Sequence, residues 1–305
     1  YTDSRRYVDG YSAHSRPAEE TGPDINRETF RRKRRAWKTP RHIVALSTWL
    51  ANEAKSSRLT GTWPIHTIPV PIDLRQWSPR DPATAKETLG LPSCEKILLF
   101  GSGGGTSRPF KGSHLLFESL PYLAEKLEKS ELSQSIRLGI FGESGDEHEQ
   151  SGFPVQYLGR LDDEGLALAY SAADVLIVPS TLEAFGQVAA EAQACGCPVI
   201  AFDNSGLADV VIDGVTGKLV PAFDQEALAR AIIWATGEPS RAAELRKAAR
   251  RHAQERWDPR VIAEKYADVL ERASTGAPSR VSRQSPSRQK NGDDNADNKP
   301  LNQVV

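Results

Sequence analysis

Short apolar runs alternate with amphipathic segments through the middle of the chain. The runs have the length of buried strands, and the segments between them repeat their apolar residues with the period of a helix. Apolar residues fill the runs without alternation, which is typical of strands covered on both faces. The pattern predicts an α/β fold, a parallel sheet with helices on both faces. The expected strands are 96–100, 136–141, 155–158, 174–179, 199–202 and 218–220, and the expected helices are 113–129, 162–173 and 224–235.

The two ends of the chain have a different pattern. Residues 1–24 are polar and show no clear period, so we expect a loop or a disordered segment there. Residues 274–305 contain no aromatic residue, and their composition predicts a disordered tail. Asn26 is the expected cap of the first long helix. Outside the alternating region we expect helices over 26–38, 48–57, 240–256 and 258–273 and a strand over 42–47.

Composition and charge exclude several classes of protein. A formal net charge of −1 gives no sign of a nucleic-acid partner. The three cysteines, two of them in Cys195-Gly-Cys197, form neither a disulfide framework nor a zinc site, which favours reduced thiols in the cytoplasm. The histidines show no metal-ligand spacing, and the acidic stretch 142–150 is interpreted as a solvated loop. No apolar run approaches the ~20 residues that span a bilayer.

Two carboxylates follow the expected strand 174–179. Glu183 lies in the loop at the carboxyl end of this strand, and Glu191 lies on the helix that the loop opens. In an open α/β sheet, ligands bind in the crevice outside the carboxyl ends of the strands. The pair therefore indicates a site for a polyhydroxylated ligand.

A glycine-rich loop follows the expected strand 96–100. It runs from Gly101 to Gly112 and contains Lys111. Glycines let a backbone approach a phosphate closely, and the next helix offers free N–H groups at its start. Such a loop also serves as a plain turn, so taken alone the segment does not decide between the two readings.

The segment around the two carboxylates resembles the signature of glycosyltransferase family 4, among the group 1 glycosyltransferases, which are retaining enzymes with the GT-B fold. That signature usually reads E-G-F-G-x-x-x-x-E-A, and this chain has Glu183-Ala-Phe-Gly186 and Glu191-Ala192 at those places. Ala184 thus replaces the usual glycine. Downstream, Asn204-Ser-Gly-Leu and Asp213-Gly-Val-Thr-Gly217 are similar to further family segments, and the resemblance covers roughly residues 42–272.

The resemblance implies two Rossmann-like domains, with the signature in the second. Because the chain has no methionine and begins at Tyr1, we expect a fragment that lacks most of the first domain. The last helix would cross back to the first domain. The expected divisions are a remnant of an acceptor domain over 1–65, a nucleotide-sugar-binding domain over 66–238, C-terminal helices over 239–273 and the tail over 274–305.

The resemblance also implies roles for single residues. Lys111 and Glu183 would be catalytic, with Lys111 on the diphosphate and Glu183 beside the sugar. Glu191 would accept hydrogen bonds from both ribose hydroxyls. The family's basic pair is incomplete, because Thr106 stands at its arginine position and Arg108 is the nearest arginine. The other expected contacts to the nucleotide sugar come from Gly103, Gly104, Gly159, Arg160, Ala184, Phe185 and Gly186.

The expected function is transfer of a hexosyl group from a nucleoside diphosphate sugar to a sugar or lipid-linked acceptor, without a metal ion or cofactor. As a fragment, the chain would bind its donor but transfer little. A non-catalytic nucleotide-sugar-binding module and a sugar-nucleotide epimerase remain as alternatives. The basic run Arg31–Arg35 is either a contact to anionic lipid at the inner membrane surface or to a phosphorylated acceptor, or a solvated helix face.

Overall fold

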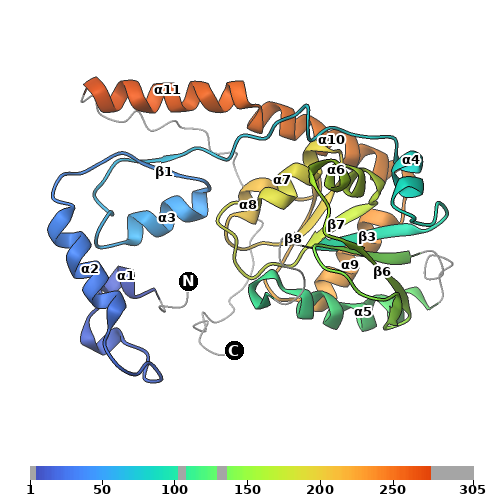
Figure 1. Ribbon diagram of the computed structural model, residues 1–305, viewed down its shortest axis with the longest axis horizontal. Coiled ribbons are helices and arrows are strands. Elements are labelled where there is room, and N and C mark those ends of the chain that lie inside the picture. Colours follow the sequence, from blue (N-terminus) through green and yellow to red (C-terminus); the bar gives the residue numbers. More distant parts are fainter. Residues whose placement is uncertain (1–4, 102–107, 129–135, 276–305) are drawn as a thin grey trace, which may run out of the picture.

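The computed structural model describes residues 5–101, 108–128 and 136–275. These residues form two units, and the chain passes between the units twice (Figure 1). The smaller unit contains the N-terminal elements, and the larger unit contains a broad sheet with helices on both sides.

The larger unit is built on a seven-stranded sheet, counted over the described residues. All neighbouring strands pair in parallel except the edge strand β5, which is antiparallel to β6. The strand order is β5-β6-β4-β3-β7-β8-β9. The strands are β3 (Lys96–Gly101), β4 (Ile136–Phe141), β5 (His148–Gln150), β6 (Phe153–Gly159), β7 (Val175–Val178), β8 (Val199–Phe202) and β9 (Gly217–Val220).

Each central strand is apolar throughout because helices cover both faces of the sheet. Alternate residues of β3 point to opposite faces: Leu98 packs in one buried cluster and Leu99 in the other. The Leu98 face is covered by α5 (Ser113–Leu127) and α9 (Gln225–Thr236). The Leu99 face is covered by α6 (Asp163–Ala172), α7 (Gln187–Ala194), α8 (Leu207–Val210) and the end of α10 (Pro239–Trp257). This confirms the α/β fold class that the apolar runs predict.

The smaller unit centres on a parallel pair of short strands, β1 (Ile43–Ala45) and β2 (Ile65–Thr67). Around them lie α1 (Arg6–Asp9), η1 (Ala13–Ser15), α2 (Ile25–Ala36) and α3 (Thr48–Ser56).

The expectation of a plain loop over residues 1–24 is wrong within the described part. Arg6, in α1, is fully buried and holds Asp24 through two hydrogen bonds, at 2.5 and 3.1 Å. Asp24 also caps α2, in place of the expected Asn26, by accepting a hydrogen bond from the Arg27 N–H. The Arg6 guanidinium holds the pKa of Asp24 at about 2, below its usual range. Arg6 also pairs with Glu20 at 3.6 Å, so buried Arg6 joins α1 to the segment that leads into α2.

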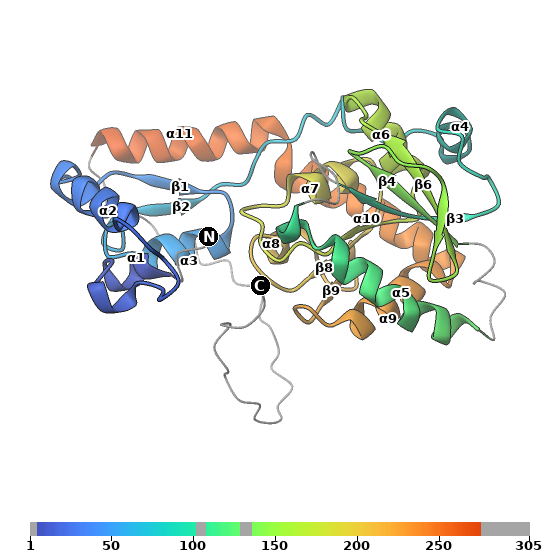
Figure 2. The same cartoon turned by 60° about the horizontal axis from the view of Figure 1, so that its bottom comes forward.

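The final helix, α11 (Pro259–Thr275), returns to the smaller unit and lies along β1 and β2, as both views show (Figure 2). Ile262 and Val269 of α11 pack on Ile68, just after β2. Where the chain crosses between the units, the Ile72 N–H donates to the Trp257 carbonyl oxygen at 2.8 Å. This hydrogen bond joins the two chain segments that connect the units.

Several short elements were not predicted: α1, η1, β2, α4 (Pro82–Thr88), η3 (Pro109–Lys111), β5 and α8. β5 lies in the acidic stretch interpreted as a loop, and β2 straddles the expected division between residues 65 and 66. Most of the expected C-terminal tail lies outside the described residues, while Ser274 and Thr275 complete α11.

The packing of α11 predicts a matched pair of variants. Ile262→Ala removes a side chain that is 2% exposed and should lower the free energy of unfolding by about 2–4 kcal/mol, measured by urea denaturation. Leu270→Ala on the same helix is the control, because Leu270 is 67% exposed and its removal should cost under about 0.5 kcal/mol. Equal effects of the two changes would contradict the docking of α11.

Candidate functional site

The strand order defines a switch point between β3 and β7. From β3 the chain moves outward to β4 and β6, and it then returns to the other side of β3 to form β7 and β8. The connections after β3 and β7 therefore lead to helices on opposite faces of the sheet, and such a switch point is the usual ligand site of open α/β sheets. Lys111 belongs to the first of these connections and Glu183 to the second.

Lys111 and Glu183 meet at this switch point. The Lys111 Nζ lies 2.5 Å from the Glu183 Oε1, and the Ser180 hydroxyl donates to the same oxygen at 3.1 Å. Both side chains of the ion pair are about one-fifth exposed, 19% and 18%. The pair is thus accessible to a ligand and partly shielded from water, which strengthens its electrostatic interactions.

The loop after β8 holds Glu183 from the other side. The Ser205 hydroxyl accepts a hydrogen bond from the Glu183 N–H at 3.0 Å, and the Gly206 N–H donates to the Glu183 carbonyl oxygen at 2.8 Å. The Asn204 side chain donates to the Thr181 carbonyl oxygen at 2.8 Å. These bonds fix the backbone of Glu183, so its carboxylate has a defined position.

The segment Ala184-Phe185-Gly186 leads into α7. Phe185 is buried and packs edge-on against Trp257, and Gly186 has a φ of 99° that favours glycine. The Ser47 hydroxyl, from the smaller unit, donates to the Ala184 carbonyl oxygen at 2.6 Å. The first N–H groups of α7 lack intrahelical acceptors, as at any helix start, and lie in the connection that carries Glu183.

Glu191 is buried on α7, with 6% of its surface exposed. Burial is the main cause that raises the pKa of its carboxyl to about 7; a hydrogen bond from Gln187 opposes this shift, and the charge of Asp163 adds to it. The Gln187 amide donates to the Glu191 Oε1 at 2.8 Å. The hydroxyl of fully buried Tyr170 faces the same carboxyl without a hydrogen bond of normal geometry in the described structure.

The two carboxylates of the signature therefore occupy different environments. Glu183 pairs with Lys111 at the switch point, while Glu191 faces α6 and contacts no cation among the described residues. Sequence reasoning did not identify Ser180, Ser205, Gln187 or Tyr170. Ser180 stands between the expected strand 174–179 and Glu183, but its bond to Glu183 requires the folded loop.

The structure describes some of the remaining predicted site residues. Gly159 ends β6 with a φ of 67°, and Arg160 follows it with an exposed side chain, ahead of α6. Arg108 caps the short helix η3 (Pro109–Lys111) and is exposed. Gly103, Gly104 and Thr106 lie outside the described residues.

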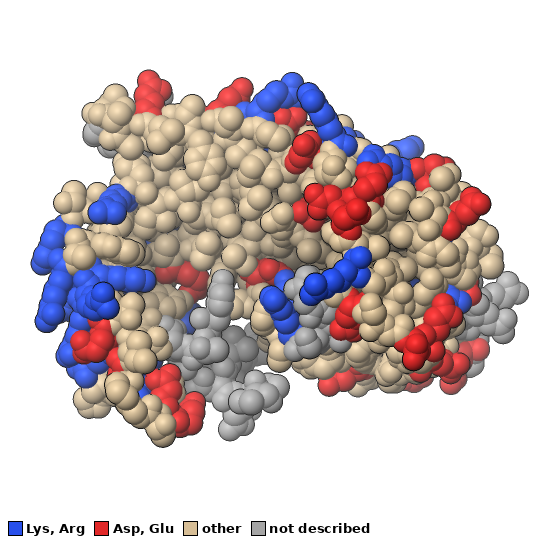
Figure 3. All heavy atoms as spheres, in the orientation of Figure 1, with Lys and Arg blue, Asp and Glu red and all other residues tan. Residues whose placement is uncertain are grey.

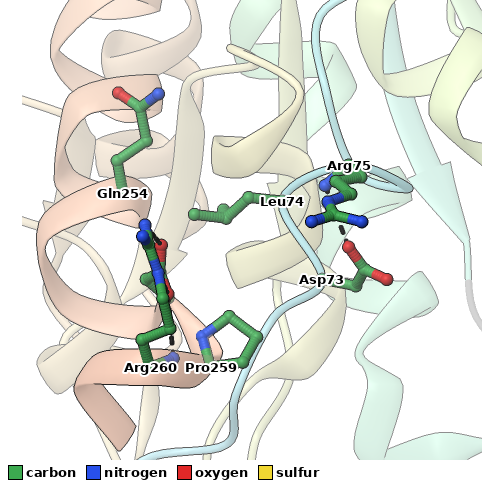
Figure 4. A pocket seen from close by; sticks show the side chains of 7 residues that line it. Asp73, Leu74, Arg75, Gln254, Pro259 and Arg260 are labelled. Atoms are coloured by element: carbon green, nitrogen blue, oxygen red, sulfur yellow. Dashed lines mark hydrogen bonds and ion pairs between the residues drawn. The ribbon is translucent and has the colours of Figure 1, made fainter.

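A cavity of about 690 Å³ lies elsewhere, at the crossing between the two units (Figure 4). Its lining comes from residues 73–75, the end of α10 and the start of α11; within it Arg260 binds Asp258 at 2.8 Å, and Asp73 accepts a hydrogen bond from the Arg75 backbone N–H at 2.9 Å. The cavity is therefore part of the connection between units and is distinct from the switch point. Leu74, Gln254 and Pro259 complete its lining.

Neither a metal centre nor a membrane span emerges from the described ranges. No three His, Cys, Asp or Glu side chains there are grouped so that they could hold a metal ion. No helix there is both long and apolar enough to cross a membrane.

The mostly parallel sheet, with the Lys111–Glu183 pair at its switch point, defines an α/β protein with helices on both faces of the sheet. Residues 86–252 match the family described as Glycosyl transferases group 1, and the chain belongs to that family. The matched segment contains the described site residues, from Arg108 to Glu191.

Curated relatives give the same class. The chain is 35% identical over 226 residues to a D-inositol 3-phosphate glycosyltransferase of Xylanimonas cellulosilytica, with 71% of this chain and 53% of that protein covered. It is 34% identical over 196 residues to the enzyme of that description in Kribbella flavida, with 60% and 45% covered. The chain spans about half the length of the curated relatives it matches.

Solved structures show the same fold. The sucrose-phosphate synthase of Thermosynechococcus elongatus superposes with a TM-score of 0.66 at 27% identity, over 88% of this chain and 66% of that one. Anabaena HepE, solved in complex with UDP-glucose, superposes with a TM-score of 0.60 at 20% identity, over 79% and 65% of the chains. The likeness to HepE shows the GT-B type of fold alone.

The buried carboxyl of Glu191 predicts a pH-dependent stability. Its pKa of about 7 lies above its ordinary 4.5, so between these values the folded state binds the proton more tightly than the unfolded chain. Its contribution to stability is thus complete below pH 4.5 and falls as pH rises toward 7. Glu191→Gln, which stays neutral, should be more stable than the wild type by about 2–3 kcal/mol at pH 8 and nearly equal at pH 5.

Urea denaturation of both proteins at the two pH values measures this difference. Glu255→Gln, an exposed position on α10, is the control and should show no pH-dependent gain. A Glu191→Gln effect that is the same at pH 5 and pH 8 would rule out a raised pKa at Glu191.

Proposed function

We propose that this chain binds a nucleoside diphosphate sugar at the switch point between β3 and β7. The observation that carries the proposal is the Lys111–Glu183 pair, 2.5 Å apart between the two diverging connections. A cation beside helix starts suits a diphosphate, and buried carboxylates suit the hydroxyls of ribose and sugar. Family membership supports the same class of ligand.

In this proposal Lys111 binds the diphosphate and exchanges its contact with Glu183 for the phosphate oxygens. The N–H groups at the start of α7 face the same charge. Glu183, held by Ser180 and Ser205, is left beside the donor sugar. The carboxylate of Glu191 accepts hydrogen bonds from the two ribose hydroxyls. For this the carboxyl must be ionised, and its Oε1 atom must accept a ribose hydroxyl beside the Gln187 amide that already bonds to it.

For the whole protein we propose retaining hexosyl transfer to a hydroxyl of a sugar or lipid-linked acceptor, as the resemblance to family 4 implies. Lys111 and the helix start stabilise the negative charge that forms on the departing diphosphate, and Glu183 stabilises the positive charge on the sugar carbon. These groups supply the needed charges without a metal ion. Because the chain spans about half the length of its relatives, donor binding is the property to test on it.

We also propose that α2 holds the protein at the cytoplasmic face of a membrane rich in anionic lipid. Seven Lys and Arg residues and no acidic residue lie between positions 31 and 41, and all of these positions are exposed. Figure 3 shows the positive charge gathered over this helix. Only Arg31 has an acidic partner in the described structure, Glu28. Ile25 and Trp37, 72% and 36% exposed, add apolar contacts.

The ribose role of Glu191 has a direct test by calorimetry with UDP and 2′-deoxy-UDP, and with the GDP and ADP pairs if these bind better. The wild type should prefer the ribonucleotide, and Glu191→Ala should lose ~1.5–3 kcal/mol of binding to it and bind both forms equally. Glu255→Ala is the control. A Glu191→Ala protein that still discriminates the 2′-hydroxyl would contradict the assignment, and a wild type that binds no nucleotide would contradict donor binding.

The membrane proposal predicts salt-sensitive binding to vesicles. The wild type should sediment with vesicles that contain phosphatidylglycerol and stay in solution with pure phosphatidylcholine. Reversing Arg32 and Arg34 to Glu should abolish sedimentation, since each basic residue contributes ~1 kcal/mol near such a surface. The control is the double variant Lys247→Glu and Arg251→Glu, which reverses two charges on α10, away from α2. Loss of binding with both double variants would point to net charge rather than to α2.

A further inference from the structure

Phe110 exposes an aromatic side chain beside the charged pair of the site. It belongs to η3, next to Lys111, and is 45% exposed. Single apolar side chains on a surface are ordinary, and Tyr122 of α5, 43% exposed, is an example. Phe110 differs from Tyr122 in its position, because both connections of the switch point hold it.

The backbone of Phe110 is tied to the loop that carries Glu183. The Thr181 N–H donates to the Phe110 carbonyl oxygen at 2.9 Å, and the Thr181 hydroxyl donates to it at 3.4 Å. On its own side, the Lys111 N–H donates to the Arg108 carbonyl oxygen at 2.9 Å and closes the turn of η3. The attachment point of the ring is therefore fixed relative to Glu183.

The ring and the Glu183 carboxylate flank one ammonium group. The Lys111 Nζ lies 5.7 Å from the centroid of the Phe110 ring, within range of a cation–π contact, and 2.5 Å from the Glu183 Oε1. An open apolar ring thus stands next to charged groups that accept and donate hydrogen bonds. A pyranose has the matching chemistry, with hydroxyls at its edge and C–H groups on its faces.

We propose that Phe110 packs against the sugar ring of the bound donor and contributes to the preference for a sugar nucleotide over the bare nucleoside diphosphate. The inference rests on the proposed donor site and adds a contact that the sequence signature does not predict. Because the ring is exposed and fixed by its backbone, its removal should leave the fold and the nucleotide contacts intact.

The test compares two affinities in one protein. Calorimetry on this chain gives the dissociation constants of UDP and UDP-glucose, and of the GDP and ADP pairs where those nucleotides bind better. The change in the ratio of the two constants between wild type and variant reports the contact of the substituted residue with the sugar, because the nucleotide part is common and the additional negative charge on the terminal phosphate of UDP is the same in both measurements. Wild type, Phe110→Ala, Phe110→Tyr and the control Tyr122→Ala are measured side by side, with melting temperatures to verify folding.

We expect Phe110→Ala to raise the dissociation constant of UDP-glucose about three- to tenfold and that of UDP less than twofold, since an aromatic contact has roughly that effect. Phe110→Tyr should keep the wild-type ratio, and Tyr122→Ala should change neither constant. If Phe110→Ala weakens binding of both ligands equally, or of neither, the sugar contact is overturned while donor-site binding stands. Absence of nucleotide binding in the wild type overturns both.

Discussion

The candidate site depends on a close backbone contact between Gly112 and Pro179. A Cβ atom at residue 112 would lie 1.9 Å from the Pro179 carbonyl oxygen, and the φ of 72° there also favours glycine. The contact presses the connection after β3 onto the connection after β7 at the switch point of the sheet. Lys111 precedes this glycine and Glu183 follows this proline by four residues, so the contact brings the two charges together.

Two further constraints keep that arrangement in place. Asn204, Ser205 and Gly206 hold the Glu183 loop from the side of β8. From the smaller unit, the Ser47 hydroxyl donates to the Ala184 carbonyl oxygen, and the Thr48 N–H donates to the carboxylate of Asp209 in α8. The placement of the smaller unit is therefore linked to the loop that carries Glu183, and α11 joins the two units on the opposite side.

The sequence predicted the parts of this structure that depend on local pattern. Buried apolar runs identify the central strands, and Asp162 and Asp224 mark helix starts that the structure shows. Strand β5 was not predicted because its His-Glu-Gln sequence is polar and largely exposed. The burial of Arg6 was not predicted because it depends on Asp24, eighteen positions along the chain. The sequence placed Lys111 and Glu183 at strand ends, but their contact joins residues 72 positions apart and follows only from the strand order.

Hydrogen–deuterium exchange with and without UDP locates the bound nucleotide without any substitution. Binding at the switch point predicts slower exchange in peptides from the described connection 108–116 and from 180–191, with no change over α2 or the outer turns of α10. Protection confined to residues 73–75 and 254–260, which line the cavity between the units, would place the nucleotide there and contradict the assignment of the site to the switch point.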